Sequence, residues 1–292
     1  MAEAREEPAM APRPLDWLNG DVAALRAEYE RQRTKALPDN VEWATLGGVR
    51  VLHHMAGSSL GTAIVYFHGG GFIVGSPTTH LDITAGLARE TGLPLYSVDY
   101  RLAPEHPSLA PIEDGIAVIR HLLASGADRL ILCGDSAGGA IALAVEAKLA
   151  TLIRKHVAGV CSFYGAYGLF DTPSLLEKGS RAEGTDVDCV RRYFALATGG
   201  MENPYGISAL AKSSDVPVYL MAAGDDPLRD DSLHLAEALK ARGRDVRLSV
   251  VEHENHGFLH GVTTSPHASD VMKQVAGWVN ALSKRDRVID EG

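Results

Sequence analysis

The sequence predicts an α/β fold, with a mostly parallel sheet of eight strands and helices on both faces. Apolar segments of strand length recur along the chain and alternate with longer segments of helical pattern. The strand segments are almost continuously apolar, which is typical of strands buried on both faces. Alternation of strand and helix favours parallel pairing through right-handed crossovers, which place helices on both sides of the sheet.

The predicted strands begin with a hairpin whose turn is Gly47-Gly48. The strands after the hairpin are rich in β-branched and aromatic residues and are bounded by Gly, Pro or Asp. In chain order, the eight expected strands are Val41–Leu46, Val49–His54, Ala63–Phe67, Leu93–Val98, Leu130–Cys133, Gly159–Phe163, Val216–Ala222 and Val246–Val251.

Helical segments lie between and after these strands. The expected helices are Leu81–Thr91, Pro111–Ala124, Gly138–Ile153, Asp230–Ala241 and Pro266–Leu282. Two parts of the chain interrupt the alternation: the first 40 residues, with one amphipathic helix expected after Asp21, and the segment from about Tyr167 to Tyr205, which has no strand pattern. We expect both to be additions that fold over one end of the sheet.

Composition excludes several classes of protein. Hydrophobic residues make up 46% of the 292 residues and charged residues 22%, which is typical of a globular protein and not of a disordered or fibrous one. The net charge of −9 disfavours nucleic acid and anionic membranes as partners. The three cysteines are too few and odd in number for a disulfide framework and lack the close paired spacing of a zinc or thioredoxin-like motif. The chain shows no signal-peptide or membrane-spanning pattern. We therefore expect a cytoplasmic protein without a membrane span.

A Gly-x-Ser-x-Gly motif lies between the predicted strand Leu130–Cys133 and the next helix, with Ser136 at its centre. Glycines are needed there because the serine occupies a strained corner, where neighbouring Cβ atoms would clash. The corner presents the hydroxyl above the sheet, beside a helix N-terminus whose free N–H groups favour negative charge. We interpret Ser136 as a nucleophile rather than as part of an ordinary glycine-rich turn.

A second motif, His-Gly-Gly-Gly at residues 68–71, follows the predicted strand Ala63–Phe67 directly. Consecutive glycines allow backbone N–H groups to approach a substrate oxygen without intervening side chains. This form is typical of an oxyanion hole, to which the residue after the nucleophile, Ala137, adds a donor. A phosphate-binding loop is the alternative, but no Gly-x-Gly-x-x-Gly pattern and no Walker lysine lies nearby.

A serine nucleophile needs a base that accepts its proton and an acid that orients the base. In this topology the chain order is serine, acid, histidine. The segment after the predicted strand Val216–Ala222 contains Asp225 and Asp226. We prefer Asp226 as the acid, with Asp225 as the alternative.

Candidate bases follow the predicted strand Val246–Val251. We prefer His256, because it lies deeper in the loop and precedes Gly257; His253 and His260 are the alternatives. Both loops leave the same end of a parallel sheet as the serine turn, so the three side chains can converge.

From about residue 63 to residue 282 the chain resembles the hormone-sensitive-lipase-like serine esterases, which have the α/β-hydrolase fold. Five motifs in the family's order carry the resemblance: His68-Gly-Gly-Gly-Phe72, Asp99-Tyr-Arg-Leu-Ala-Pro-Glu-His-Pro107, Gly134-Asp-Ser-Ala-Gly-Gly139, Asp226-Pro-Leu-Arg-Asp230 and His256-Gly-Phe258. The resemblance implies a helical cap. We therefore expect cap segments at residues 1–40 and 166–205, and a core formed by residues 41–165 and 206–292.

The resemblance also implies a role for each matching residue. The nucleophile, acid and base are Ser136, Asp226 and His256, and the oxyanion hole consists of the N–H groups of Gly70, Gly71 and Ala137. Asp99, Asp135 and the segment 100–107 are expected to support the site. One segment departs from the family pattern, because the chain has Ser162-Phe-Tyr where relatives carry Ser-Pro-Trp. We predict substrate contacts for Phe72, Tyr164 and Tyr167.

These features predict a carboxylic ester hydrolase for small-molecule esters with short acyl chains, which needs no cofactor and no metal ion. An amide or formamide hydrolase would use the same three side chains and is the first alternative. A non-catalytic ligand receptor on this fold is the second, although such receptors lose the histidine that this chain keeps. The exposed edge of the strand Val246–Val251 suggests a homodimer.

Overall fold

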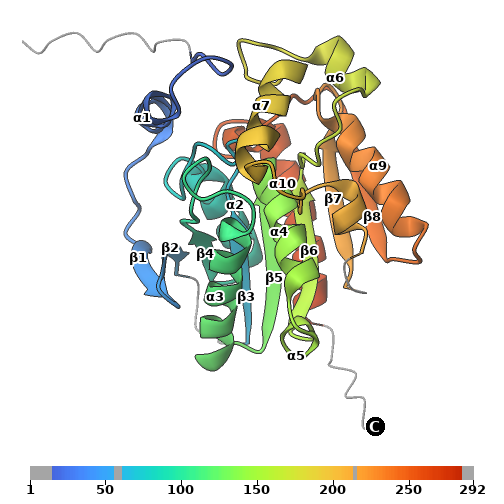
Figure 1. Cartoon of the computed structure of the whole chain (residues 1–292). Helices are drawn as coiled ribbons and strands as arrows, with labels where there is room; N and C mark the ends of the chain where they lie inside the picture. The colour runs from blue at the N-terminus through green and yellow to red at the C-terminus, as the bar shows by residue number, and fades with distance from the viewer. Residues whose placement is uncertain (1–14, 56–60, 213–215, 285–292) are drawn as a thin grey trace, which may run out of the picture.

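One sheet of eight strands runs through the part of the chain that the computed structural model describes, which is residues 15–55, 61–212 and 216–284 (Figure 1). The strand order is β1-β2-β4-β3-β5-β6-β7-β8. β2 pairs antiparallel with β1 and β4, and every other pair is parallel. The mostly parallel eight-stranded sheet predicted from the sequence is therefore confirmed.

The strands have bounds close to those predicted from the apolar segments. They are β1 (Val41–Leu46), β2 (Val49–His54), β3 (Thr62–Phe67), β4 (Leu95–Val98), β5 (Arg129–Asp135), β6 (Val157–Phe163), β7 (Val218–Ala223) and β8 (Val246–Val251). β4 begins two residues later than predicted, directly after Pro94, whose ring nitrogen has no hydrogen to donate to a neighbouring strand. All residues of β3 and β7 are buried, as expected for strands covered on both faces.

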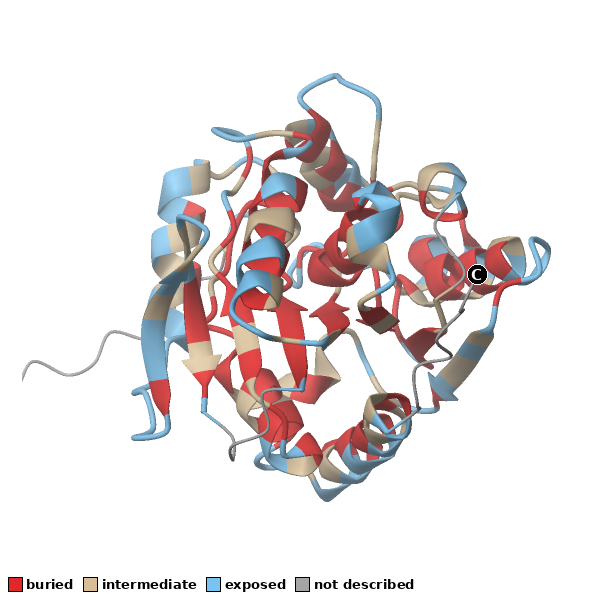
Figure 2. Cartoon of the chain, turned by 90° about the horizontal axis from the view of Figure 1, so that it is seen from below, coloured by how far each residue is buried: buried red, intermediate tan, exposed pale blue. Residues whose placement is uncertain are grey.

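Helices cover both faces of the sheet, and the buried residues lie between these layers (Figure 2). α3 (Ala110–Ala124), α4 (Ala137–Lys148) and α9 (Arg229–Lys240) pack on one face. α2 (Leu81–Thr91) and α10 (Pro266–Ser283) pack against each other and on the opposite face. The central strands are thus rigidly held, and the loops at their carboxyl ends can be positioned accurately.

The prediction of one continuous helix over Gly138–Ile153 is wrong. α4 ends at Lys148, and a separate short helix, α5 (Thr151–Arg154), follows two residues with extended backbone, Leu149 and Ala150. The buried Leu149 anchors the break in the core, and the Arg154 guanidinium donates to the carbonyl oxygens of Leu149 (2.7 Å) and Ala147 (3.1 Å). No Gly or Pro marks this break, so local sequence could not reveal it.

Helices from the N-terminal part of the chain and from the segment between β6 and β7 lie over the carboxyl ends of the strands (Figure 1). These helices are α1 (Val22–Arg33), α6 (Pro173–Lys178) and α7 (Val187–Thr198). A further helix of the second segment, α8 (Ile207–Leu210), packs instead against α4 and α9. Leu25 and Tyr29 of α1 are buried in a cluster with Ile73 and Val74, beside the glycine motif. Residues 1–14 of the expected N-terminal cap segment and residues 285–292 of the expected core lie outside the described residues.

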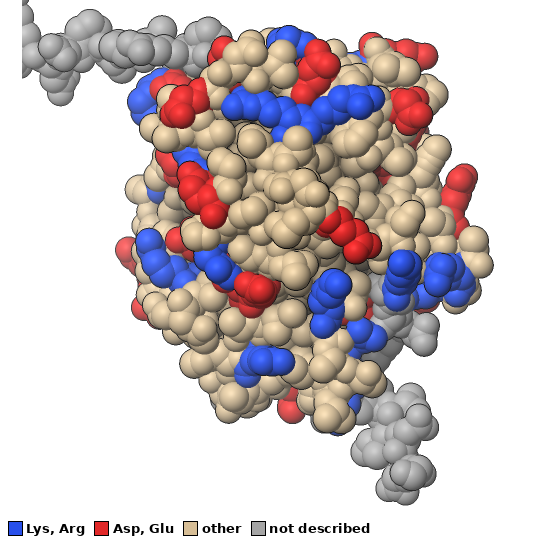
Figure 3. Space-filling view, viewed as in Figure 1, with Lys and Arg blue, Asp and Glu red and all other residues tan. Residues whose placement is uncertain are grey.

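Charged side chains of both signs are interspersed on the face of the molecule drawn in Figure 3. Within the described ranges, every helix is too short or too polar to cross a membrane.

Candidate active site

Ser136 occupies a sharp turn between β5 and α4, with backbone angles φ 52° and ψ −121°. Such a positive φ costs a residue with a side chain on the order of 1–3 kcal/mol, which the surrounding structure must offset. Two glycines make the turn possible. A Cβ on Gly134 would lie 2.3 Å from the carbonyl oxygen of Gly138, and a Cβ on Gly138 would lie 2.0 Å from that of Phe67.

His256 connects Ser136 to Asp226 by two hydrogen bonds. Its Nε2 lies 2.9 Å from Ser136 Oγ, and its Nδ1 lies 2.9 Å from Asp226 Oδ2. The three residues follow β5, β8 and β7, which belong to one parallel block of the sheet. The structure therefore brings together three side chains that are remote in the sequence and that the sequence predicted to converge.

The carboxylate of Asp226 fixes the orientation of the imidazole. Asp226 is fully buried, and its Oδ1 accepts the backbone N–H of Leu228 at 2.7 Å. Burial lowers the pKa of His256, but the charge and hydrogen bond of Asp226 offset this and hold the pKa above its ordinary value. Tyr164 packs edge-on against the imidazole, with 5.2 Å between the ring centroids. With the Nδ1 hydrogen directed at Asp226, Nε2 is free to accept the hydroxyl proton of Ser136.

The alternative acid and bases named from the sequence lie elsewhere. The exposed Asp225 pairs with Lys178 Nζ at 2.8 Å. The side chain of His253 is 94% exposed. His260 lies beside Asp135 and His80, and the hydrogen bonds to Ser136 and Asp226 come from His256 instead.

The glycine motif turns back on itself beside Ser136. Gly70 and Gly71 have φ values of 114° and 58°, and the carbonyl oxygen of Gly70 accepts the N–H groups of Ile73 (3.1 Å) and Val74 (3.0 Å). Within the described residues, the N–H groups of Gly70 and Gly71 donate no hydrogen bond, and both residues line the same cavity as Ser136. Two free backbone donors therefore lie near the hydroxyl.

Asp135 fixes the start of this glycine loop. Its Oδ1 accepts the Tyr66 hydroxyl at 2.7 Å and the Gly69 N–H at 3.0 Å, so Gly69 is not free to bind a substrate. His68 stacks on Tyr100, whose hydroxyl donates to the His68 carbonyl oxygen at 2.7 Å. These contacts match the supporting role expected for Asp135.

The segment 100–107 is tied to helix α1. The Arg26 guanidinium forms an ion pair with Glu105 at 2.6 Å and donates to the carbonyl oxygens of Ile73 (2.6 Å) and Ala103 (2.5 Å). Helix α1 is thereby linked to the loop that carries the free glycine donors.

A cavity of about 670 Å³ opens over the nucleophile. Its walls come from the sheet loops, from α1 and from the segment between β6 and β7, and they are mainly apolar and aromatic. Two of the lining residues, Trp17 and Tyr193, pack edge-to-face with 6.2 Å between ring centroids. Charged lining residues include Arg33, whose guanidinium lies 4.7 Å from the centre of the Tyr29 ring, and Glu183.

Comparison with known proteins identifies the family. The model of a family described as alpha/beta hydrolase fold matches residues 64–260. The chain belongs to the α/β-hydrolase family. Solved structures of hormone-sensitive lipases are among its matches, which confirms the resemblance that the five motifs predict.

This α/β hydrolase is 34% identical to esterase LipI of Mycobacterium tuberculosis over 71% of the chain and 68% of that relative. It is 28% identical to an acetyl esterase of Salmonella paratyphi B over 97% of the chain and 93% of the relative. A crystal structure of an esterase from the bacterial hormone-sensitive lipase family superposes with a TM-score of 0.82 at 26% identity, covering 91% of this chain and 93% of that one. A hormone-sensitive lipase from a metagenome library gives 0.78 at 30% identity, covering 88% and 91%.

Two of the three residues predicted to contact substrate line the cavity of this α/β hydrolase, and one does not. Phe72 and Tyr164 are lining residues. Tyr167 is absent from the described lining residues; it is buried, and its hydroxyl bonds to Ser162 Oγ at 2.6 Å while its N–H donates to Asp231. Tyr167 thus belongs to the core below the turn, because the chain folds back after Tyr164.

The sequence did not predict which residues between β6 and β7 line the cavity, such as Tyr193 and Thr185. Their only signal was an aromatic-containing segment without strand pattern, which gives no information on which side chains face inward.

Proposed function

We propose that this protein hydrolyses carboxylic esters with short acyl chains, with Ser136 as nucleophile, His256 as general base and acid, and Asp226 as the residue that orients His256. The observation that carries the proposal is the pair of 2.9 Å hydrogen bonds that His256 makes to Ser136 and Asp226. The esterase relatives and hormone-sensitive lipase structures support the same class of reaction.

The reaction follows from this geometry. Ser136 Oγ attacks the ester carbonyl carbon while His256 Nε2 takes the hydroxyl proton, and Asp226 stabilises the resulting imidazolium. The carbonyl oxygen becomes an oxyanion that accepts hydrogen bonds from the backbone N–H groups of Gly70, Gly71 and Ala137. Loss of one such donor lowers kcat on the order of 10²–10³-fold. His256 returns the proton to the departing alcohol, which leaves an acyl-enzyme on Ser136.

Water then repeats the sequence on the acyl-enzyme. His256 takes a proton from the water as it attacks the acyl carbon, and the second tetrahedral intermediate uses the same N–H donors. When it collapses, the Ser136 oxygen leaves with the proton from His256, and the free acid departs. Every step uses this chain's own side chains and backbone.

The walls of the cavity support a short acyl group. Trp17 and Tyr193 close one side by ring contact, and a Cβ on Gly71 would lie only 2.9 Å from the Tyr193 ring. The acetyl esterase relative is named for a short acyl ester. A long chain would have to separate these aromatic side chains.

The experiment compares 4-nitrophenyl acetate, butyrate and palmitate with the matching anilides, using the wild type and Ser136→Ala. We expect rapid turnover of acetate and butyrate, slow turnover of palmitate and anilides, and no turnover by Ser136→Ala. Faster hydrolysis of anilides would favour the amide hydrolase, and preference for palmitate would contradict the short-acyl assignment. A wild type without turnover of any substrate would favour a receptor.

We also propose that residues 1–40 and 166–205 act together as the cap, and that two copies of the chain pair through β8. β8 is the last strand of the sheet, and most of its residues are exposed or half-buried. A mass of one chain in light scattering would contradict the pairing. The three cysteines are free and buried, which suits a reducing compartment, so we place the protein in the cytoplasm.

A further inference from the structure

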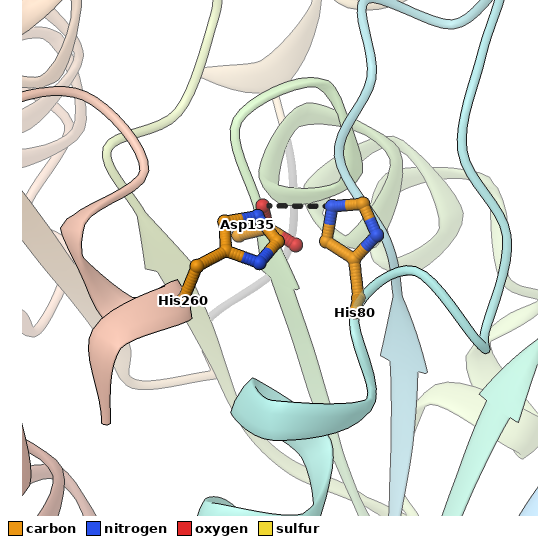
Figure 4. Close-up of side chains that lie close together, drawn as sticks. All are labelled: His80, Asp135 and His260. Carbon is orange, nitrogen blue, oxygen red and sulfur yellow. Dashed lines mark ion pairs between the residues drawn. The ribbon is translucent and has the colours of Figure 1, made fainter. Parts of the chain in front are cut away.

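Three side chains of types that can bind a metal, His80, Asp135 and His260, come from distant parts of the chain and lie close together (Figure 4). His80 precedes α2, Asp135 ends β5, and His260 lies in a short 3₁₀ helix, η1 (Phe258–Gly261). One candidate ligand atom from each lies within 4.8 Å of the other two. The proposed hydrolysis does not use this cluster as a donor or acceptor of protons, so its chemistry needs a separate explanation.

His80 and Asp135 each have one polar atom engaged by neighbouring groups, and the second polar atom of each side chain faces the other residue. His80 Nδ1 lies 2.8 Å from Thr79 Oγ1 and 3.3 Å from the carbonyl oxygen of Ser76. A carbonyl oxygen only accepts, so Nδ1 carries a hydrogen, and Nε2 is the ring nitrogen directed at the cluster. Nε2 faces Asp135 Oδ2 at 3.5 Å.

Asp135 has the same arrangement, with one oxygen engaged and one available. The Tyr66 hydroxyl and the Gly69 N–H both donate to Oδ1, which leaves Oδ2 for the cluster. A metal ion bound between Oδ2 and His80 Nε2 would displace a proton held there, so binding of the ion competes with protonation. Ligands oriented by outer hydrogen bonds are typical of metal sites in proteins.

His260 supplies the third ligand. Its ring centroid lies 4.7 Å from that of His80, and its side chain makes no hydrogen bond within the described residues. With neither ring nitrogen bonded there, His260 can direct one of them toward the cluster. All three residues line the cavity, which gives an ion a path from solvent.

We propose that His80, Asp135 and His260 bind a divalent transition-metal ion, for which Zn²⁺ is the probe, and that the bound ion inhibits the enzyme reversibly. Two histidines and one carboxylate form a common ligand set for zinc, with water in the fourth position on the cavity side. Ligand atoms of a tetrahedral zinc site lie about 3.3 Å apart, so the separations must close by at most about 1.5 Å. Side-chain rotation of His260, which has no hydrogen bond to break, can supply this movement.

The inhibition rests on the proposed function. The charge of Asp135 is among the groups that raise the pKa of His256. A cation on Asp135 would offset that charge and disfavour the imidazolium that forms when Ser136 attacks. The water molecule bound to the metal ion would also occupy space beside Ser136.

Calorimetric titration of the full chain with ZnCl₂, after treatment with EDTA and its removal, measures binding without reference to activity. We expect one tight equivalent per chain. His260→Ala should weaken the affinity for zinc by at least about tenfold, and His260→Asp, which keeps a ligand, should restore part of that affinity. His121→Ala is the matched control, because His121 is exposed on α3 away from the cluster, and it should bind zinc like the wild type.

The same variants are then assayed with 4-nitrophenyl butyrate, each relative to its own metal-free rate. Zinc should inhibit the wild type and His121→Ala, and much higher concentrations should be needed for His260→Ala. Zinc should also raise the melting temperature of the wild type and not that of His260→Ala, which shows in addition that the variant is folded. Absence of the tight equivalent, or equal binding by His260→Ala, would overturn the site.

The two proposals can fail separately. A metal-free wild type that does not hydrolyse butyrate would contradict the proposed function even if it bound zinc through His260. Zinc inhibition that persists in His260→Ala would point to the His256–Asp226 pair as the binding place and would overturn the metal site while leaving the esterase intact.

Discussion

Asp226 Oδ2 lies 2.9 Å from His256 Nδ1, and this contact joins two loops that are separated in the chain by helix α9 and strand β8. It exists because β7 and β8 are parallel neighbours whose carboxyl ends lie side by side. The buried carboxylate determines which nitrogen of the ring faces Ser136.

The pH dependence of kcat/KM should report the raised pKa of His256. The base must be neutral to accept the Ser136 proton, and Asp226 holds the His256 pKa above its ordinary value of 6.5. Activity should therefore rise with pH and reach half of its maximum above pH 6.5. A profile with 4-nitrophenyl butyrate, corrected for spontaneous hydrolysis, measures this midpoint.

Asp226→Asn should lower both the rate and that midpoint. Without the carboxylate, burial dominates and lowers the pKa of His256, and the amide favours the wrong tautomer of the ring. Turnover should decrease by about 10⁴-fold, the loss known for the equivalent change in a serine protease triad. An unchanged midpoint in the variant would show that Asp226 is not the partner of the titrating group.

Gly71→Ala should reduce kcat/KM by about 10²-fold, the scale of loss expected when a reacting geometry shifts by about an ångström. The new Cβ would lie 2.9 Å from the ring of Tyr193, and the backbone φ of 58° disfavours a side chain. Gly277→Ala is the control, because a Cβ there meets nothing within 4 Å in helix α10. It should keep full activity and gain up to about 1 kcal/mol in unfolding free energy. Equal kcat/KM values of the two variants would contradict a role of the glycine loop in catalysis.

Trp17→Ala should widen the acyl preference. Trp17 lines the cavity and contacts the rings of Tyr29 (6.1 Å) and Tyr193 (6.2 Å), so its removal opens space next to the nucleophile. Each further buried methylene contributes about 0.8 kcal/mol, so burial of about two of the four extra methylenes of octanoate should raise kcat/KM relative to butyrate by about tenfold. The matched control is Trp43→Ala on β1, where the ring is 37% exposed and stacks with Arg50. An equal change of the octanoate-to-butyrate ratio in both variants would show that the effect comes from reduced stability of the whole fold and not from the cavity.

Local sequence patterns predicted the bounds of most helices and strands, because the residues that mark an end in the sequence also end the element in the structure. α2 ends where predicted, since Gly92 adopts the left-handed conformation that closes the helix. β8 has its predicted bounds because a polar loop precedes its apolar residues and a second one follows them. The break after Lys148 escaped prediction because it depends on Leu149 packing in the core.

Part of the candidate active site could also be predicted from the sequence. Chain order and the parallel sheet suffice to predict that Ser136, Asp226 and His256 can meet. Whether Tyr167 faces the cavity or the core depends on a backbone reversal at Tyr164, whose φ is 39°, and no local pattern marks that reversal. His260 appeared only as an alternative base, since its approach to Asp135 and His80 requires the packing of η1 against α2.

Covalent trapping at Ser136 tests the central claim most directly. The full chain is incubated with a fluorophosphonate, digested, and mapped by mass spectrometry, with Ser136→Ala and His256→Ala in parallel. One adduct per chain should appear on the peptide that contains Ser136, with none in Ser136→Ala and much slower labelling in His256→Ala. Labelling of another residue, or wild-type labelling rates in His256→Ala, would contradict the account.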